Sequence, residues 1–354
     1  MSSRRVLLLL VQALLIWDAV LAQSPTTNTT NPASGNQRKR SSIMKYEPSV
    51  PGNIIFGGLY MILGLIFSYH VYKNSDKWAI CLPIGAIASS LGFFIKITID
   101  PMNLKLMTYI IQNAFIVISP TAFLAFNYML YGRFITAIDP KFDIHNIKAG
   151  SKMEKSRFSF IPPRIVGRTF VWSDIITFLI QMAAGGLQAG GGTKGDAKMS
   201  ELGFNLFLAA VIIQGISYCL FTVLLLVAVK KLIEERRKSP SMRGNGWMGL
   251  DSRTTLIVAQ LFVSSIFIII RSIFRIVEYA GGYDGYLANE EVYLFVLDAA
   301  PLVIAIGVFA FIWPPVLLST IAAQTRQAEQ NYSMETTSSA PIPIGQRSDH
   351  MRLV

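Results

Sequence analysis

Apolar residues in this chain occur in long, continuous runs that are separated by short polar segments. Each run has roughly the 20 residues that an α-helix needs to cross about 30 Å of hydrocarbon. Apolar and polar residues do not alternate within them, as they would in the strands of a membrane barrel. We therefore predict an all-α, polytopic membrane protein, a bundle of seven transmembrane helices. The seven runs are 53–72, 78–98, 107–131, 170–189, 203–229, 254–280 and 291–318.

A shorter apolar run, residues 6–16, precedes these seven. Arg4 and Arg5 come before it, and the small residues at 20–22 follow it. This arrangement is typical of a secretory signal peptide, and the run is short for a membrane span. We predict a signal peptide at 1–22; an uncleaved eighth helix is the alternative.

The polar ends of the chain set the remaining domain limits. Residues 23–51 are rich in Thr, Asn, Ser and Pro, which predicts a disordered extracellular segment, with an N-glycosylation sequon at Asn28. The seven-helix membrane domain is expected at 52–318. A disordered cytosolic tail, rich in Ser and Thr, is expected at 319–354.

Positive charge is distributed unevenly among the loops. Eight Lys and Arg residues fall within 132–169 and seven within 230–253, whereas 281–290 contains none. Loops rich in Lys and Arg stay in the cytosol. We therefore predict that the N-terminus lies outside and the C-terminus in the cytosol, which also agrees with a signal peptide.

Composition supports the membrane assignment and excludes other classes. Of the 354 residues, 52% are hydrophobic and 15% are charged, against about 25% charged in a typical soluble domain. The net charge of +11 lies mainly in loops, where it favours acidic membrane surfaces over nucleic acid. The two cysteines lie in apolar runs and the three histidines are scattered, so we expect neither a disulfide framework nor a metal site, and no cofactor.

Charged side chains within the apolar runs are the main candidates for function, because they are costly in lipid. At about 1.5 Å per residue, Arg271 lies about 25 Å along the sixth helix and Lys96 about 27 Å along the second. Asp298 lies about 10 Å into the seventh helix, which runs the opposite way. Arg271, Arg275 and Glu278 share one helical face. These five residues therefore share the outer half of the bundle, with one positive charge in excess.

This pattern predicts an outward-facing polar cavity that holds an amphipathic or charged headgroup. The alternative is a paired network that only fixes helix packing. Near the cytosolic side, Asp174 is expected to pair with Asn127 or Arg133, and we assign these three a structural role. Substrate binding is assigned to Lys96, Gln112, Gln181, Gln214, Arg271, Arg275, Glu278 and Asp298.

Several familiar motifs are missing. The glycine-rich run at 190–194 lacks the spacing of a phosphate-binding loop, so no ATP-driven pump is indicated. The seventh helix has no lysine for a retinal Schiff base, and the third ends in YMLYGR, not Asp-Arg-Tyr. No nucleophile–base pair stands out, so an intramembrane hydrolase has little support and we expect no enzyme.

The polar positions also resemble those of the fungal RTA-like, or lipid-translocating exporter, family of seven-helix membrane proteins. The similarity covers roughly residues 46–318. The second helix departs from the family pattern, since Ser89 stands in place of an acid and Lys96 in place of an arginine. The matching positions are Gln112, Pro120, Tyr128, Arg133, Asp174, Gln181, Gly185, Gly186, Gln214, Gly215, Arg271, Arg275, Glu278, Gly281, Gly282, Glu291, Tyr293 and Asp298.

The resemblance implies export or transbilayer movement of amphipathic lipids, with sphingoid long-chain bases as the best-known cargo and the plasma membrane as the usual location. Other members look linked to resistance to toxic sterols and drugs, or to porphyrin movement. On this hypothesis Glu278 and Asp298 bind a cationic amine, and Arg271 and Arg275 orient the two acids. The alternative is a seven-helix receptor or lipid-stress sensor that signals through its cytosolic loops and tail.

Overall fold

The computed structural model describes residues 49–99, 106–139, 162–238, 250–281 and 291–338. Within these residues, seven helices are long and apolar enough to cross a membrane, which confirms the predicted architecture. The predicted signal peptide and nearly all of the predicted extracellular segment lie outside the described residues.

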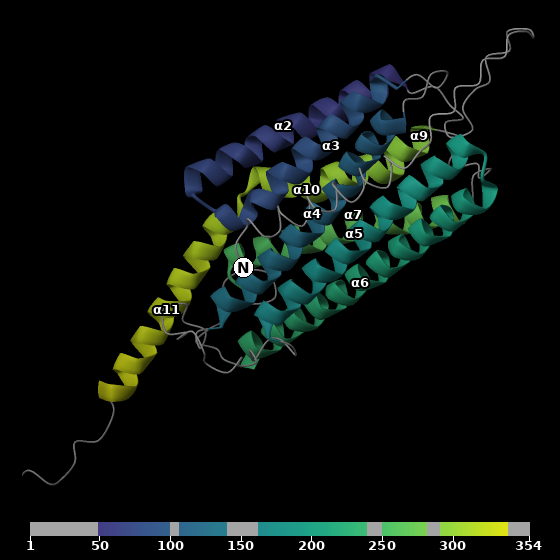
Figure 1. The fold of residues 1–354 in the computed structure, drawn as a ribbon. Coiled ribbons are helices and arrows are strands. Elements are labelled where there is room, and N and C mark those ends of the chain that lie inside the picture. The colour runs from purple at the N-terminus through teal and green to yellow at the C-terminus, as the bar shows by residue number, and fades with distance from the viewer. Residues whose placement is uncertain (1–48, 100–105, 140–161, 239–249, 282–290, 339–354) are drawn as a thin grey trace, which may run out of the picture.

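The helices form one elongated bundle (Figure 1). The first six spans are α2 (Val50–Asn74), α3 (Cys81–Ile97) after the short 3₁₀ turn η1 (Lys77–Ile80), α4 (Leu106–Ile138), α5 (Pro163–Lys194), α6 (Ala197–Lys238) and α7 (Ser252–Ala280). The seventh span consists of α9 (Glu291–Tyr293), the π-helical turn η4 (Leu294–Ala299) and α10 (Ala300–Phe311), and α11 (Pro314–Ser338) follows it.

Small residues allow neighbouring helices to approach closely. A Cβ atom on Gly203 of α6 would lie 2.5 Å from the backbone nitrogen of Gln188 and 2.7 Å from the carbonyl oxygen of Ala184, both in α5. A Cβ on Gly85 of α3 would lie 2.6 Å from the ring of Phe123 in α4. Because lipid is as apolar as a helix surface, such close packing is a main source of helix association in membranes.

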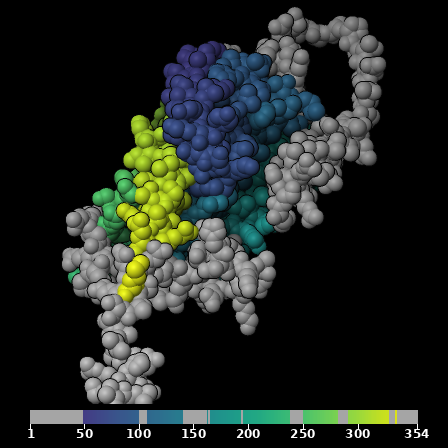
Figure 2. All heavy atoms as spheres, turned by 90° about the vertical axis from the view of Figure 1, so that its left-hand side faces the viewer, coloured from purple at the N-terminus to yellow at the C-terminus, as the bar shows by residue number. Residues whose placement is uncertain are grey.

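Helix α2 lies on the surface of the bundle, next to α3 and α10 (Figure 2). Ile55 and Leu65 are exposed on its outer side, whereas Tyr60 and Phe67 are buried against the bundle. One face of α2 is thus suited to contact lipid. The other face packs against the core.

The seventh span ends earlier than predicted. The run at 291–318 was expected to form one helix, but Ile312 is extended, with φ −134° and ψ 110°. The prolines at 314 and 315 explain the break, because neither has an N–H for the carbonyl four residues earlier, Pro314 also disfavours helical backbone at Trp313, and proline fits well at the start of the next helix.

Helix α11 then continues to Ser338, beyond the end of the bundle (Figure 1). A disordered tail was predicted from residue 319, so the structure corrects that prediction for 319–338. These residues contain good helix formers such as Ala, Gln, Glu and Met, which the polar composition had masked. Residues 339–354 lie outside the described part.

Candidate functional site

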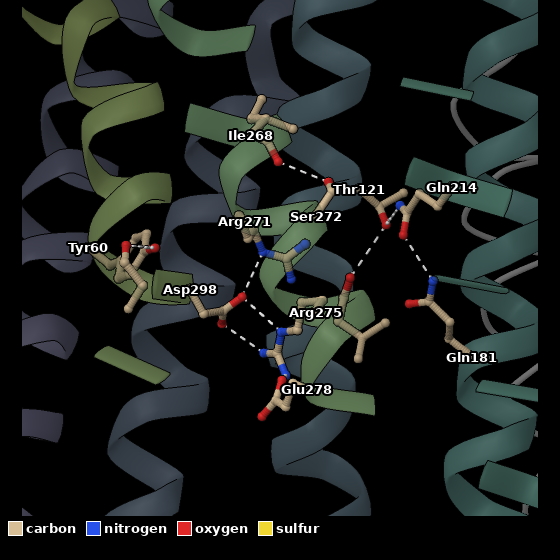
Figure 3. Close-up of polar contacts among 12 residues, drawn as sticks. Tyr60, Thr121, Gln181, Gln214, Ile268, Arg271, Ser272, Arg275, Glu278 and Asp298 are labelled. Carbon is tan, nitrogen blue, oxygen red and sulfur yellow. Dashed lines mark hydrogen bonds and ion pairs between the residues drawn. The ribbon is translucent and has the colours of Figure 1, made fainter. Parts of the chain in front are cut away.

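Four charged side chains from α7 and the seventh span meet in one cluster (Figure 3). We call Arg271, Arg275, Glu278 and Asp298 the arginine–carboxylate cluster. Arg275 donates two hydrogen bonds to Asp298, from Nε to Oδ1 at 2.8 Å and from Nη2 to Oδ2 at 2.7 Å. Its Nη1 donates to Glu278 Oε2 at 3.1 Å. The structure therefore brings together four of the five charged residues that the sequence placed in one group.

The π-helical turn η4 sets the position of Asp298. Pro301 follows it and has no N–H to give to the carbonyl of Leu297, and its ring crowds that carbonyl. Widening to a π turn relieves the crowding, and such turns are frequent at functional sites. The hydroxyl of Tyr60 donates to the carbonyl oxygen of Ala299 at 3.0 Å and so fixes this turn to α2.

Arg271 is held less completely than Arg275. Its Nε lies 2.9 Å from Asp298 Oδ1, but the N–H is not aligned for a hydrogen bond. No described residue accepts a hydrogen bond from Arg271 Nη1 or Nη2. In Figure 3 these two nitrogens point away from Asp298, toward the side of the bundle that holds Thr121 and Gln214.

A cavity of about 30 Å³ lies on that side, between α4, α5, α6 and α7. It is large enough for about two water molecules and too small for a lipid headgroup. Polar groups on its wall come from all four helices. They are Asn113, Gln181, Gln214, Arg271, Ser272, Arg275 and Tyr279.

Two of the predicted amides link the helices around this cavity. Gln181 Nε2 donates to Gln214 Oε1 at 2.9 Å, and Gln214 Nε2 donates to Thr121 Oγ1 at 3.4 Å (Figure 3). The third predicted amide, Gln112, is buried on α4 but is not among the residues that line the cavity. Its neighbour Asn113 lines it instead, because the two differ by about 100° around the helix.

Lys96 lies outside the arginine–carboxylate cluster. Its Nζ is 2.8 Å from Glu291 Oε1, and the same carboxylate accepts from Asn53 Nδ2 at 2.9 Å and from the backbone N–H of Ser49. This second group joins α2, α3 and α9. Glu291 was not predicted as a site residue, because an acid in the first turn of a helix resembles an ordinary cap.

The pairing of Glu291 changes the charge balance. Three acids now face three cations in these two groups, so the predicted excess of one positive charge is wrong. The six charges sum to zero, but they are not distributed evenly around the cavity. Both arginines line the cavity, whereas no carboxylate does among the described residues.

The residues with a predicted structural role do not pair as expected. Asn127 Nδ2 donates to Tyr218 and to Ser264, each at 2.9 Å, and so links α4, α6 and α7. Arg133 lies over the ring of Trp78, 4.6 Å from its centroid, in a cation–π contact.

Asp174 is fully buried, and neither of its oxygens has a hydrogen-bond partner among the described residues. The nearby polar group is the hydroxyl of Tyr128. The expected pairing of Asp174 with Asn127 or Arg133 is therefore wrong. Both candidate partners are engaged with aromatic and hydroxyl groups instead.

Comparison with known proteins assigns a family to this arrangement. The family described as RTA1-like protein matches residues 82–320. Protein RTA1 of Saccharomyces cerevisiae is 24% identical over 85% of this chain and 94% of its own length. The lipid-translocating exporter-like protein RTA1 of Ajellomyces capsulatus is 26% identical over 68% of this chain and 69% of its own.

A third relative, the probable lipid transporter atnI of Emericella nidulans, is 25% identical over 75% of this chain and 66% of its own length. No solved structure matches the chain.

Proposed function

Because this chain belongs to the RTA1-like protein family, we propose that it moves amphipathic lipids across the bilayer without ATP. Two relatives carry the words lipid-translocating exporter and lipid transporter in their names. We further propose that it is a multi-pass protein of the plasma membrane that enters through the secretory pathway.

The observation that carries the proposal is the polar cavity among α4, α5, α6 and α7. A lipid headgroup crosses hydrocarbon slowly because its polar groups lose their hydrogen bonds to water. Amide and guanidinium groups at membrane depth replace some of those bonds. The acyl chains of the lipid stay between apolar helix faces, such as the exposed one that includes Ile213 and Ile216 on α6.

The cavity is smaller than a headgroup, so binding requires the helices around it to separate. Gly215 of α6 lies at this place, where its α-carbon faces Ile276 and Ser272 of α7. A small residue there leaves few interlocking side chains to part. We propose that α6 and α7 move apart here to admit the headgroup.

The geometry does not favour an amine held by Glu278 and Asp298. Asp298 is already engaged by two arginines and Glu278 by one. A cationic amine would have to displace a guanidinium from its carboxylate. We therefore propose that these two acids position the arginines, which reverses the roles expected from the sequence.

A receptor or lipid-stress sensor is the second candidate. Helix α11 supports it, because this helix extends from the bundle, carries most of the Ser and Thr residues of the predicted tail, and could transmit a change in helix packing to residues 339–354. The truncation that separates the two functions must spare α11, since α11 packs against α4 and α7. We therefore choose truncation after Ser338.

The test compares efflux of a preloaded fluorescent phospholipid from cells that express the full chain or residues 1–338 at equal surface levels. A carrier keeps its efflux rate in the truncated form, whereas a sensor that acts through the tail loses the response. The exposed variant Lys230→Gln, far from the cavity on α6, is the matched control. Loss of efflux in the truncated form alone would contradict the carrier assignment.

A further inference from the structure

Arg271 directs two hydrogen-bond donors at the cavity and not at an acceptor among the described residues (Figure 3). Its side chain is only 11% exposed, so the positive charge is largely cut off from solvent. The neighbouring Arg275 uses Nε, Nη1 and Nη2 on Asp298 and Glu278. Arg271 makes one misaligned contact to Asp298, and its Nη1 and Nη2 donate to no residue in the described part of the chain.

The other polar groups of the cavity wall include several neutral amides. Asn113 presents an amide, and its Nδ2 packs over Gly185, where a Cβ atom would lie 3.0 Å away. The amides of Gln181 and Gln214 are hydrogen-bonded to each other. The wall formed by the described residues thus offers amides and two guanidinium groups, but no carboxylate.

A ligand atom that enters the cavity therefore meets N–H donors and a positive potential. Such a site suits an acceptor oxygen, and a charged oxygen suits it best, because charge-assisted hydrogen bonds are roughly twice as strong as neutral ones. An ammonium group would meet two like charges instead. Its attraction to Asp298 would be blocked by the guanidinium groups on both sides of that carboxylate.

We propose that this cavity binds the oxyanion of a lipid headgroup, a phosphate or a carboxylate, through Nη1 and Nη2 of Arg271. The chain consequently moves anionic amphiphiles faster than cationic ones. This inference rests on the proposed lipid translocation and specifies the headgroup for it. Arg271 offers a planar fork that matches an oxyanion, whereas lysine would keep the charge and lose the fork.

The test uses the purified full chain in neutral liposomes that contain one of three fluorescent lipids. All three have the same diacylglycerol part, labelled on one acyl chain, and they differ only in the headgroup. The headgroups are a phosphate, a hemisuccinate carboxylate and a trimethylammonium cation. Reduction of the outer-leaflet dye by dithionite measures the rate at which each lipid crosses.

We expect at least one anionic lipid to cross about tenfold faster than the cationic one, a factor typical of one charge-assisted hydrogen bond. The anion that crosses faster identifies the phosphate or the carboxylate source. Arg271→Gln removes this preference, and Arg271→Lys retains part of it. Lys230→Gln, which changes an exposed side chain on α6, leaves all three rates as they were.

The outcomes distinguish a failure of the headgroup assignment from a failure of the proposed lipid translocation. If the cationic lipid crosses as fast as both anions, or faster, the headgroup assignment is overturned while lipid translocation stands. If no lipid crosses above the rate of empty liposomes, lipid translocation and the headgroup assignment both fail. If Arg271→Gln does not elute as a folded monodisperse protein, Arg271→Lys decides, because an unchanged preference in that variant also contradicts the role of the fork.

Discussion

Replacement of Asp298 by asparagine tests how the arginine–carboxylate cluster stabilises the fold. The carboxylate receives three guanidinium nitrogens at 2.7, 2.8 and 2.9 Å. Asparagine has the same shape, but it presents one oxygen and an amide that faces the arginines. Two buried cations then share Glu278 as their nearest acid.

The expected loss of unfolding free energy follows from the contacts that Asp298 makes with Arg275 and Arg271. Interhelical hydrogen bonds in membranes contribute roughly 0.6 kcal/mol on average and at most about 1.7 kcal/mol. The two hydrogen bonds from Arg275 amount to about 1–3 kcal/mol, and the ion pair with Arg271 brings the loss toward the roughly 3–5 kcal/mol that follows removal of one partner from a buried ion pair. We expect Asp298→Asn to lower the free energy of unfolding by about this much.

The assay is reversible unfolding in mixed micelles with increasing dodecyl sulfate, followed by the fluorescence of the tryptophans, among them Trp78, Trp172 and Trp313 in the bundle. Lys230→Gln is the control, because its ion pair with Glu234 spans 4.0 Å on an exposed surface and should change stability by less than about 0.5 kcal/mol. In the double variant with Arg275→Gln, the loss should be smaller than the sum of the single losses. A loss within the range of the control, or strict additivity, would refute the role given to this pair.

Three further predictions address other parts of the fold. Gly203→Ala should lower the free energy of unfolding by about 1–3 kcal/mol in the same titration, because its Cβ would collide with the backbone of Gln188; Gly58→Ala, where no atom lies within 4 Å, should lose nothing. Asp174→Asn should preserve or raise the melting temperature at neutral pH, because it neutralises a buried carboxylate without a hydrogen-bond partner, and a clear fall would contradict this. Cys219, which is exposed near the middle of α6, should resist maleimides in intact vesicles and react after denaturation in dodecyl sulfate, because maleimides attack thiolates, which form in water and not in hydrocarbon; mass spectrometry checks this, and labelling in intact vesicles would contradict a lipid-facing position.

The sequence predicted the helices well because long apolar runs have few alternatives in lipid. It also predicted that Arg271, Arg275 and Glu278 share a face, since their spacing of four and three residues follows the helical repeat. Helix ends were harder. Helix α4 continues to Ile138, past the end of its apolar run, because helical hydrogen bonds persist where hydropathy falls.

The partners of the charged residues could not be predicted, because they depend on how the helices rotate about their axes. The π-helical turn before Pro301 sets the direction of Asp298, and no periodicity of the ordinary helix reports it. Lys96 was grouped by depth with the arginines, yet a different acid, Glu291, lies within its reach. Depth along a helix follows from counting residues, whereas the choice of partner requires the packed bundle.

If this chain itself carries lipid across a bilayer without ATP, as we propose, the purified protein alone should be sufficient. The most direct measurement reconstitutes the purified full chain in ATP-free liposomes with a fluorescent phospholipid in both leaflets, and then adds dithionite. Empty liposomes lose about half of the signal, the share in the outer leaflet. We expect liposomes with the protein to lose nearly all of the signal while they remain sealed to dithionite. A loss that stays at the level of empty liposomes, from protein shown to be folded and inserted, would contradict direct lipid translocation by this chain.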